Sequence, residues 1–279
     1  MQTLESPLLT LGAGNMAHAI MAGAQNGGTL NPGLVAALDP NADRRELFEH
    51  AFNSPSDAIS WLTRQEGGRP LVLLAVKPQI LAEALPPLVE AMRGQQTPPS
   101  TFVSILAGTK IDAIRGLVRE EDRVIRVMPN TPAQIGLGMS AIANDQGAHA
   151  DDLESVRRLF LAVGEVIEIP ESLIDGFTAV AGSGPAYIFY LAEGMMQAAE
   201  SVGFTREQAS TIVRQTVLGS ATLLGNSDEM PGALRAKVTS KNGTTYAATT
   251  TLDEHGVMGA IVAAITAARD RGVELGRSS

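Results

Sequence analysis

Small hydroxyl side chains and a glycine are concentrated in S-K-N-G-T-T, residues 240–245, just before a stretch that is predicted to form a helix. The first backbone N–H groups of a helix have no partner within it, and the helix dipole places positive charge near them. Such a helix start can hold a carboxylate or a phosphate. The alternative is ordinary capping, because Ser, Thr and Asn are the residues that most often begin helices. Other motifs in the chain must decide between a binding site and a cap.

A second candidate site lies near the N-terminus, where an apolar run, residues 8–11, ends in G-A-G-N-M-A. The pattern G-x-G-x-x-A after a strand is typical of dinucleotide-binding proteins. Gly12 allows the tight turn, Gly14 lets the backbone approach a pyrophosphate, and the small Ala17 lets the helix pack on the strand. The first half of the chain is therefore predicted to bind a nucleotide cofactor.

The end of the second predicted strand, residues 34–38, carries residues that can distinguish NAD from NADP. Asp39 stands roughly 20 residues past the glycine turn, where an acidic residue binds the ribose hydroxyls of NAD. Arg44 and Arg45 follow, and an arginine near this turn can instead bind the 2′-phosphate of NADP. The alternative is a simple turn followed by solvated arginines. Asp39 is given more weight, and the choice between NADH and NADPH stays open.

Two further turns follow apolar runs that are typical of buried parallel strands. The run at residues 71–76 is followed by Lys77 and Pro78, and the run at residues 102–106 is followed by a turn of small residues, 107–109. Ligands of open α/β sheets bind at the carboxyl ends of the strands, so both turns are candidates for cofactor contact. An exposed lysine without a function is the alternative for Lys77.

Strands alternating with helices predict a doubly wound α/β sheet of the Rossmann type. Further strands are expected at residues 124–128, 139–143 and 164–169, with helices at 80–92 and 153–161. The P-N-T-P-A loop at 129–133 is held extended by its two prolines. We predict a dinucleotide-binding domain over residues 1–170 and an all-α domain over residues 171–279.

The second half is predicted to be helical because β-branched runs give way to segments rich in Ala, Met and Leu. G-S-G-P-A-Y, residues 182–187, interrupts and restarts a helix. An apolar stripe follows at helical spacing and indicates a core or a subunit interface: Tyr187, Leu191, Met195 and Ala198. Residues 205–208 resemble a capping segment, and further helices are expected from 231, 244 and 258.

Composition limits the possible functions. With 279 residues, 44% of them hydrophobic and 18% charged, a soluble protein of two domains is expected. No apolar run could span a bilayer, and the lack of cysteine and of a signal peptide favours a cytoplasmic location. A net charge of −9 argues against nucleic acid as a partner. The four histidines are scattered, so no metal is predicted.

Six motifs together resemble the pyrroline-5-carboxylate reductase family over nearly the whole chain: G-A-G-N-M-A, A-V-K-P, S-I-L-A-G, R-V-M-P-N-T-P-A, G-S-G-P-A-Y and V-T-S-K-N-G-T-T. The resemblance implies hydride transfer from NADPH or NADH to the C=N bond of 1-pyrroline-5-carboxylate, giving L-proline. It also implies that the helical domain interlocks with its twin, so that the substrate pocket forms in a homodimer. Relatives often assemble further, commonly to decamers.

The same resemblance implies the roles of particular residues. The cofactor would be held by the following residues, to which the position after the second strand adds Asp39: Gly12, Ala13, Gly14, Asn15, Met16, Ala17, Ala75, Val76, Lys77, Pro78, Ala107 and Gly108. The substrate would be held by Ser240, Gly243, Thr244 and Thr245, with Thr245 as the catalytic residue whose hydroxyl binds the ring nitrogen. Glu171 either contacts the substrate or orders the pocket, or is a solvated acidic residue at a helix start.

The chain departs from the family pattern at one place in the substrate segment. Most relatives have P-G-G-T-T, whereas Lys241 and Asn242 precede Gly243 here. Asn tolerates positive φ better than most residues, so the turn is expected to keep its shape. Two alternatives stay open. One is another imine or β-hydroxyacid reductase, which would use a lysine of the helical domain such as Lys237 or Lys241, and the other is a non-catalytic cofactor-binding protein.

Overall fold

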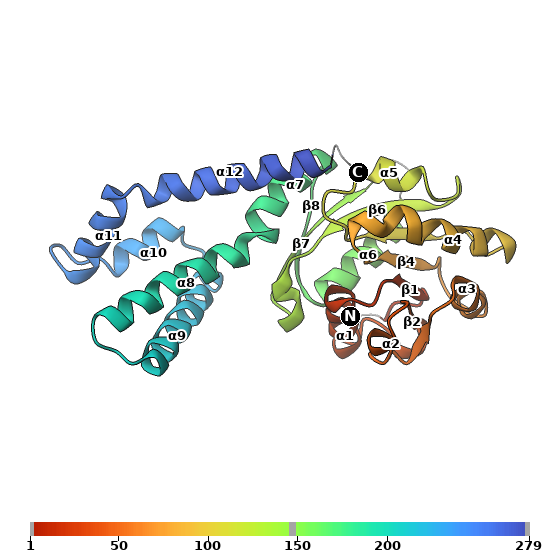
Figure 1. The fold of residues 1–279 in the computed structure, drawn as a ribbon, viewed down its shortest axis with the longest axis horizontal. Coiled ribbons are helices and arrows are strands. Elements are labelled where there is room, and N and C mark those ends of the chain that lie inside the picture. The colour runs from red at the N-terminus through yellow and green to blue at the C-terminus, as the bar shows by residue number, and fades with distance from the viewer. Residues whose placement is uncertain (1–2, 145–148, 277–279) are drawn as a thin grey trace. The chain divides into compact units, whose positions relative to one another are not determined.

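The computed structural model describes residues 3–144 and 149–276 (Figure 1). The chain divides into two compact units, Met1–Ser183 together with Ala268–Ser279, and Gly184–Ala267. The first unit thus includes residues 171–183 and the end of the last helix, which the sequence assigns to the helical domain. The boundary at residue 170 stays a prediction about folding domains.

The first unit is built on an eight-stranded sheet of order β3-β2-β1-β4-β5-β6-β7-β8. β1 to β6 are parallel, β7 is antiparallel to β6, and β8 is parallel to β7. The first six strands have the order that Rossmann sheets share, so the predicted fold class is confirmed. The strands are β1 (Leu8–Leu11), β2 (Val35–Leu38), β3 (His50–Phe52), β4 (Leu71–Leu74), β5 (Thr101–Ser104), β6 (Arg123–Met128), β7 (Gly138–Asn144) and β8 (Gly164–Glu168).

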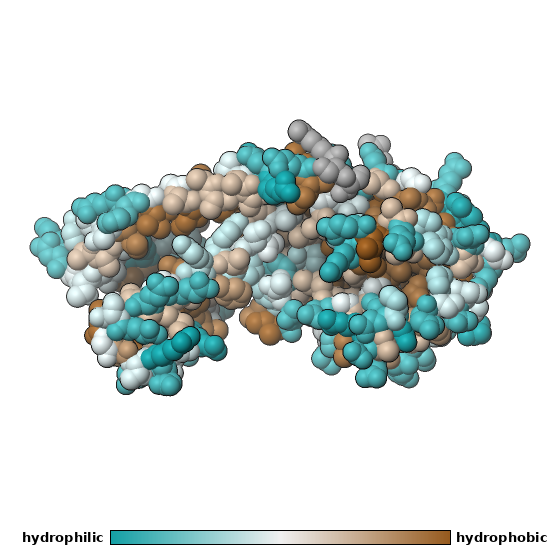
Figure 2. Space-filling model, viewed as in Figure 1, coloured by the Kyte–Doolittle hydropathy of each residue, from teal (hydrophilic) through white to brown (hydrophobic). Residues whose placement is uncertain are grey.

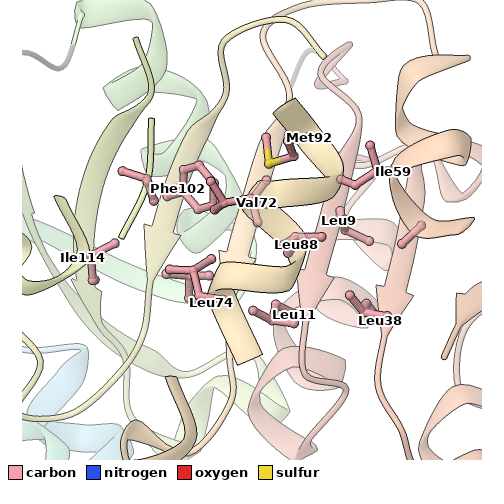
Figure 3. Packing of buried hydrophobic residues seen from close by; sticks show 14 of the residues in the cluster. Leu9, Leu11, Leu38, Ile59, Val72, Leu74, Leu88, Met92, Phe102 and Ile114 are labelled. Atoms are coloured by element: carbon pink, nitrogen blue, oxygen red, sulfur yellow. The ribbon is translucent and has the colours of Figure 1, made fainter. Parts of the chain in front are cut away.

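Helices cover both faces of this sheet (Figure 1). They are α1 (Asn15–Asn26), α2 (Ala42–Arg45), α3 (Pro55–Thr63), α4 (Leu81–Gly94), α5 (Ile111–Arg115), α6 (Ala150–Leu161) and α7 (Ile174–Phe177). Alternate strand residues point to opposite faces: Leu9 and Leu11 pack with α3, α4 and α5, whereas Leu8 packs with α1 and α6. Figure 3 shows the first of these clusters, where Leu88 and Met92 of α4 lie over the strands. Because both faces are covered, four strands are buried at every position: β1, β2, β4 and β5.

The elements of the first unit that were not predicted include β3, α3 and α5. β3 has three residues, and all of them are only partly buried, so it lacks an apolar run. α3 did carry a signal, because Ser54 accepts a hydrogen bond from the N–H of Asp57 and Pro55 occupies the first turn. The helix start S-P-S-D could therefore have been read from the sequence.

An ion-pair network lies at the amino ends of β5 and β6, opposite the carboxyl ends where ligands bind. Arg119 and Asp122 are buried, with Nη2 of the arginine 2.7 Å from Oδ1 of the carboxylate. The hydrogen bond to Asp122 raises the pKa of Arg119. Nearby, burial lowers the pKa of Arg69. Because these groups are joined to one another and to the backbone, we assign this end of the sheet to stability.

The second unit is helical, as predicted. Its helices are α8 (Gly184–Ser201), α9 (Arg206–Gly225), α10 (Pro231–Lys237), α11 (Thr244–Glu254) and α12 (Val257–Leu275), the last of which ends in the first unit. Thr205 and Gln208 form the predicted capping box at the start of α9. The predicted interruption before α8 is a π-helical turn over Thr178–Gly182. No helix of the described residues is long and apolar enough to cross a membrane.

The second unit buries few apolar side chains in one copy of the chain. Within Gly184–Ala267, which is described throughout, only Ala209 and Val213 belong to the buried hydrophobic residues. Large apolar side chains such as Phe189 and Met230 are 63% and 76% exposed. Figure 2 shows apolar residues along the visible side of α12. The stripe that begins at Tyr187 is therefore not the core of a single chain, which leaves a subunit interface.

Candidate active site

The glycine turn is fixed by close contact between β1 and β4. Gly12 has a φ of +97°, and a Cβ placed there would lie 2.8 Å from the carbonyl of Ala75 and 2.9 Å from the nitrogen of Val76. Its N–H donates to the carbonyl of Leu38 at 2.9 Å. Only glycine satisfies both the conformation and the space, so Gly12 serves the turn as predicted by the motif.

Gly14 has the opposite environment. It is the N-cap of α1 with a φ of −69°. Among the described residues, no side chain caps that helix, and no atom lies within 4 Å of a Cβ built at this position. Ala17 one turn further on is fully buried against the sheet. The space at Gly14 and the free N–H groups of the α1 start together suit a pyrophosphate, so the residues present fit a dinucleotide cofactor.

Asp39 lies at the carboxyl end of β2 and is bound to the glycine turn. Its Oδ2 accepts a hydrogen bond from the N–H of Ala13, and its Oδ1 accepts one from the N–H of Asn41, both at 2.8 Å. The carboxylate is only partly buried, and it retains further acceptor positions. Asp39 thus connects the glycine turn to the loop after β2.

The side chains of the two arginines that follow Asp39 point back toward the glycine turn and the end of β2. Nη1 of Arg44 donates to Oδ1 of Asn15 at 2.5 Å, so this side chain reaches the first residue of α1. Nη1 of Arg45 donates to the carbonyls of Asp39 and Pro40 at 2.9 and 2.8 Å. The structure therefore brings one carboxylate and two guanidinium groups to the carboxyl end of β2.

The A-V-K-P segment begins where β4 ends. The N–H of Ala75 donates to the carbonyl of Leu11 at 2.9 Å, which extends the pairing of β4 with β1 up to the contact with Gly12. Lys77 is exposed and is the N-cap of a short 3₁₀ helix, Pro78–Ile80. The main chain of this segment borders the glycine turn, whereas the lysine side chain extends into solvent.

The turn after β5 contains a buried hydroxyl, that of Thr109. Gly108 has a φ of +73° in this turn. The next residue, Thr109, is 3% exposed, and its Oγ1 makes no hydrogen bond within the part of the chain that the structure describes. A buried hydroxyl without a partner costs free energy, which a ligand could recover by supplying a hydrogen bond. Thr109 belongs to the turn that was predicted to contact the cofactor, although it was not named among the individual site residues.

The segment S-K-N-G-T-T forms a turn that leads into α11 in the second unit. The N–H of Gly243 donates to the carbonyl of Ser240 at 3.0 Å, and a Cβ on Gly243 would lie 2.3 Å from Oγ of Ser240. Gly243 is the N-cap of α11, and no side chain caps the helix. The N–H groups of Thr244 and Thr245 precede the first hydrogen bond of the helix, which runs from Ala247 to Gly243. Ordinary side-chain capping is therefore not the role of these hydroxyls.

Asn242 adopts the left-handed conformation that the sequence predicts for it, with a φ of +61°. Replacing it with glycine, which adopts this conformation at no cost, should leave kcat/KM within about twofold and raise the unfolding free energy by up to about 1 kcal/mol. Steady-state kinetics and denaturant unfolding measure the two effects. Asn242→Val is the control, since a β-branched residue at positive φ should lower both. A large fall in activity for Asn242→Gly would mean that the amide itself is needed.

Glu171 is partly buried and lies in the first unit, where its carboxylate accepts hydrogen bonds from the N–H of Ile111 and from Arg126. Arg126 was not predicted, although a charged residue inside an apolar strand is a signal for a buried ion pair. Asn130 of the P-N-T-P-A loop donates to the carbonyl of Ala181 and accepts from the N–H of Met139. Both of its polar atoms thus hold the loop in place.

A groove of about 610 Å³ lies along α1 in the first unit, with Leu47, Gln134 and Ile135 at its sides. Asn15 is the only predicted site residue that lines it. The groove therefore does not coincide with the predicted cofactor turns. Among the described residues, no cluster of three or more His, Cys, Asp or Glu could hold a metal ion.

Comparison with known proteins agrees with these features. Residues 171–275 match the family model for pyrroline-5-carboxylate reductase dimerisation. A pyrroline-5-carboxylate reductase of Synechocystis is 37% identical over 271 residues, which cover 96% of this chain and 97% of the relative. The chain belongs to the pyrroline-5-carboxylate reductase family. The Arabidopsis thaliana enzyme of this name is 34% identical over 273 residues, 96% of this chain and 95% of its own. The solved reductase structure from Coxiella burnetii has a TM-score of 0.85 and 28% identity, covering 97% of this chain and 98% of that one.

Family membership confirms the predicted function, an NAD(P)H-dependent reductase of 1-pyrroline-5-carboxylate in proline biosynthesis. The match to a dimerisation model also supports a homo-oligomer. The individual roles of the site residues in this reductase stay predictions.

Proposed function

We propose that, in reducing the C=N bond of 1-pyrroline-5-carboxylate to L-proline, this chain holds cofactor and substrate with the residues that the motifs predict. The observation that carries the proposal is that two helices begin without a side-chain cap, so their first N–H groups are available to a ligand. α1 begins at the open Gly14, and α11 begins at Gly243, and neither has a side-chain cap. One start suits a pyrophosphate, and the other suits a carboxylate.

The residues of α11 bind and orient the substrate in this proposal. The N–H groups of Thr244 and Thr245 bind the substrate carboxylate, and the Ser240 hydroxyl is a further donor. The N–H of Gly243 is already used within the turn. The Thr245 hydroxyl hydrogen-bonds the ring nitrogen. A nicotinamide cofactor supplies the hydride when bound, so the main task of the protein is orientation. A substrate bound as the protonated iminium needs no further acid, which suits a site without His or Cys.

The preference between the two cofactors is set, in this proposal, by the charges at the end of β2. Asp39 favours NADH by accepting from ribose hydroxyls and repelling a 2′-phosphate, whereas Arg44 and Arg45 favour NADPH. A reductase from Plasmodium falciparum of the same fold has been solved with NADP bound. We give Asp39 the greater weight in setting this preference, because its carboxylate accepts a hydrogen bond directly from the glycine turn.

Asp39→Ser is expected to shift the ratio of kcat/KM for NADPH to that for NADH by about tenfold toward NADPH, or roughly 1.4 kcal/mol. Arg44→Ala should shift it in the opposite direction. The KM and kcat values for the two cofactors measure both shifts. Asp43→Ser is the control, because Asp43 is exposed and has no bond to the glycine turn. An unchanged ratio in Asp39→Ser would assign Asp39 to the turn alone.

Beyond the homo-oligomer, we propose a homodimer at least, with a decamer as the larger assembly. The exposed apolar side chains of the second unit support this, since such surface is typical of obligate interfaces. A cytoplasmic location without nucleic acid or membrane as a partner is part of the same proposal and is supported by the net charge of −9.

A further inference from the structure

One carboxylate oxygen of Glu171 joins three segments of the first unit. Glu171 begins the short 3₁₀ helix Glu171–Leu173. Its Oε1 accepts a hydrogen bond from the backbone N–H of Ile111 at 2.7 Å and another from Nη1 of Arg126 at 3.1 Å. The donors belong to α5 and β6, which lie 60 and 45 residues away in the sequence. Three distant segments therefore meet at a single atom.

Arg126 fixes the position of this carboxylate. Its side chain is 3% exposed and comes from β6, where Arg126 lies opposite Ser104 of β5. A second carboxylate, that of Asp175, lies 3.8 Å from Nη2. A buried guanidinium group is stable only when acidic or other acceptor groups surround it. The arginine thus holds Glu171 against the sheet.

The bond to Ile111 makes Glu171 the cap of α5. Ile111 is the first residue of that helix, and the N-cap residue Lys110 supplies no side-chain hydrogen bond. A carboxylate at a helix start receives an otherwise unpaired N–H group and faces the positive end of the helix dipole. A residue far along the chain thus performs the role that a local Ser or Asp usually has.

The capped helix starts next to the turn at residues 107–109. On its other side, the turn lies against the end of α12. The backbone of Gly276, the residue after this helix, is so close that a Cβ built on it would lie 3.1 Å from the carbonyl oxygen of Gly108. The buried Oγ1 of Thr109, for which residues 3–144 and 149–276 provide no partner, belongs to the same turn. The backbone of this turn is therefore held between α12 and the Glu171 cap.

We propose that Glu171 is a positioning residue for the cofactor: held by Arg126, it fixes the turn at residues 107–109 through the first N–H of α5. The proposal rests on the proposed contact of Ala107 and Gly108 with the cofactor. It assigns Glu171 to the cofactor side of the reaction, and not to contact with the substrate.

The first test measures cofactor binding without turnover. Glu171→Ala removes both hydrogen bonds and should raise the Kd of NADPH and NADH, measured by nucleotide fluorescence titration, about tenfold, the loss expected for a charge-assisted hydrogen bond. The KM of pyrroline-5-carboxylate at saturating cofactor should stay within about twofold of the wild-type value. Glu171→Gln keeps an acceptor for Ile111 and should restore most of the affinity.

A matched control separates the cap from the ion pair. Asp175→Asn removes a carboxylate beside Arg126 but leaves the hydrogen bond to Ile111. It should leave the cofactor Kd unchanged. A raised substrate KM with an unchanged cofactor Kd in Glu171→Ala would overturn the proposal in favour of substrate contact. A lowered Tm with an unchanged cofactor Kd would overturn it in favour of a purely structural role.

Amide hydrogen exchange over residues 106–114 distinguishes failure of this proposal from failure of the cofactor assignment. In the wild-type protein, NADPH should slow exchange in this segment, and without cofactor Glu171→Ala should exchange faster there than wild type. If NADPH leaves the wild-type segment unprotected, the assignment of the turn to the cofactor is wrong. If NADPH protects the wild-type segment but Glu171→Ala changes neither exchange nor Kd, the positioning proposal alone is wrong.

Discussion

Gly12→Ala is expected to destabilise the first unit by roughly 4 kcal/mol, a large part of the 5–15 kcal/mol that typically separates folded from unfolded proteins. Part of the loss comes from the φ of +97°, which an alanine adopts only with strain. The rest comes from the new Cβ, which would lie 2.8 Å from the backbone carbonyl of Ala75 and would push the end of β4 away from β1. Thermal and denaturant unfolding measure the effect, which should appear with or without cofactor.

Gly14→Ala is the matched variant of the same motif, and it should give the opposite result. Gly14 has a φ of −69°, and the new Cβ would meet no atom of the described residues within 4 Å, so stability should be unchanged. The methyl group would instead occupy the space proposed for the pyrophosphate and weaken cofactor binding on the order of 100-fold, about 2.7 kcal/mol. Equal stability losses in the two variants, or unchanged cofactor affinity in Gly14→Ala, would contradict the division of roles between the two glycines.

The sequence predicted the features that depend on local patterns. An apolar run bounded by turn residues identifies a buried strand, so β1, β4 and β5 were found close to their observed positions. The positive φ of Asn242 was predicted in the same way, because few residues other than glycine and asparagine adopt it. β3 was missed because it has no buried residue that would create such a pattern.

Contacts between distant segments could not be predicted from these patterns. The hydrogen bond from Ile111 to Glu171 joins residues that share no periodicity or motif. The sequence pattern of α12 predicts a helix but does not predict that its C-terminal part belongs to the first unit. The apolar stripe at Tyr187 could not be assigned to a core or an interface, because the amphipathic pattern is the same in both cases. The exposure of the second unit's apolar side chains in the single chain favours the interface.

Thr245→Val is expected to lower kcat/KM for pyrroline-5-carboxylate on the order of 100-fold, about 2.7 kcal/mol, with most of the loss in kcat. The substitution keeps the shape and the β-branch and removes only the hydroxyl, which we propose to hydrogen-bond the ring nitrogen. Among the described residues, that hydroxyl has no hydrogen-bond partner, and α11 has no side-chain cap. Its removal should therefore leave the Tm unchanged, because no bond within the protein is lost.

Thr251→Val is the control for this prediction, since Thr251 lies in the same helix and its hydroxyl donates to the carbonyl of Ala247, away from the helix start. It should leave kcat/KM within about twofold and change stability by a few tenths of a kcal/mol. A fall of less than about tenfold in Thr245→Val would show that the hydroxyl does not orient the imine, because a lost bond to a reacting group usually costs more than 1.4 kcal/mol. The N–H groups at the start of α11 would then bind the substrate without it, through the carboxylate alone.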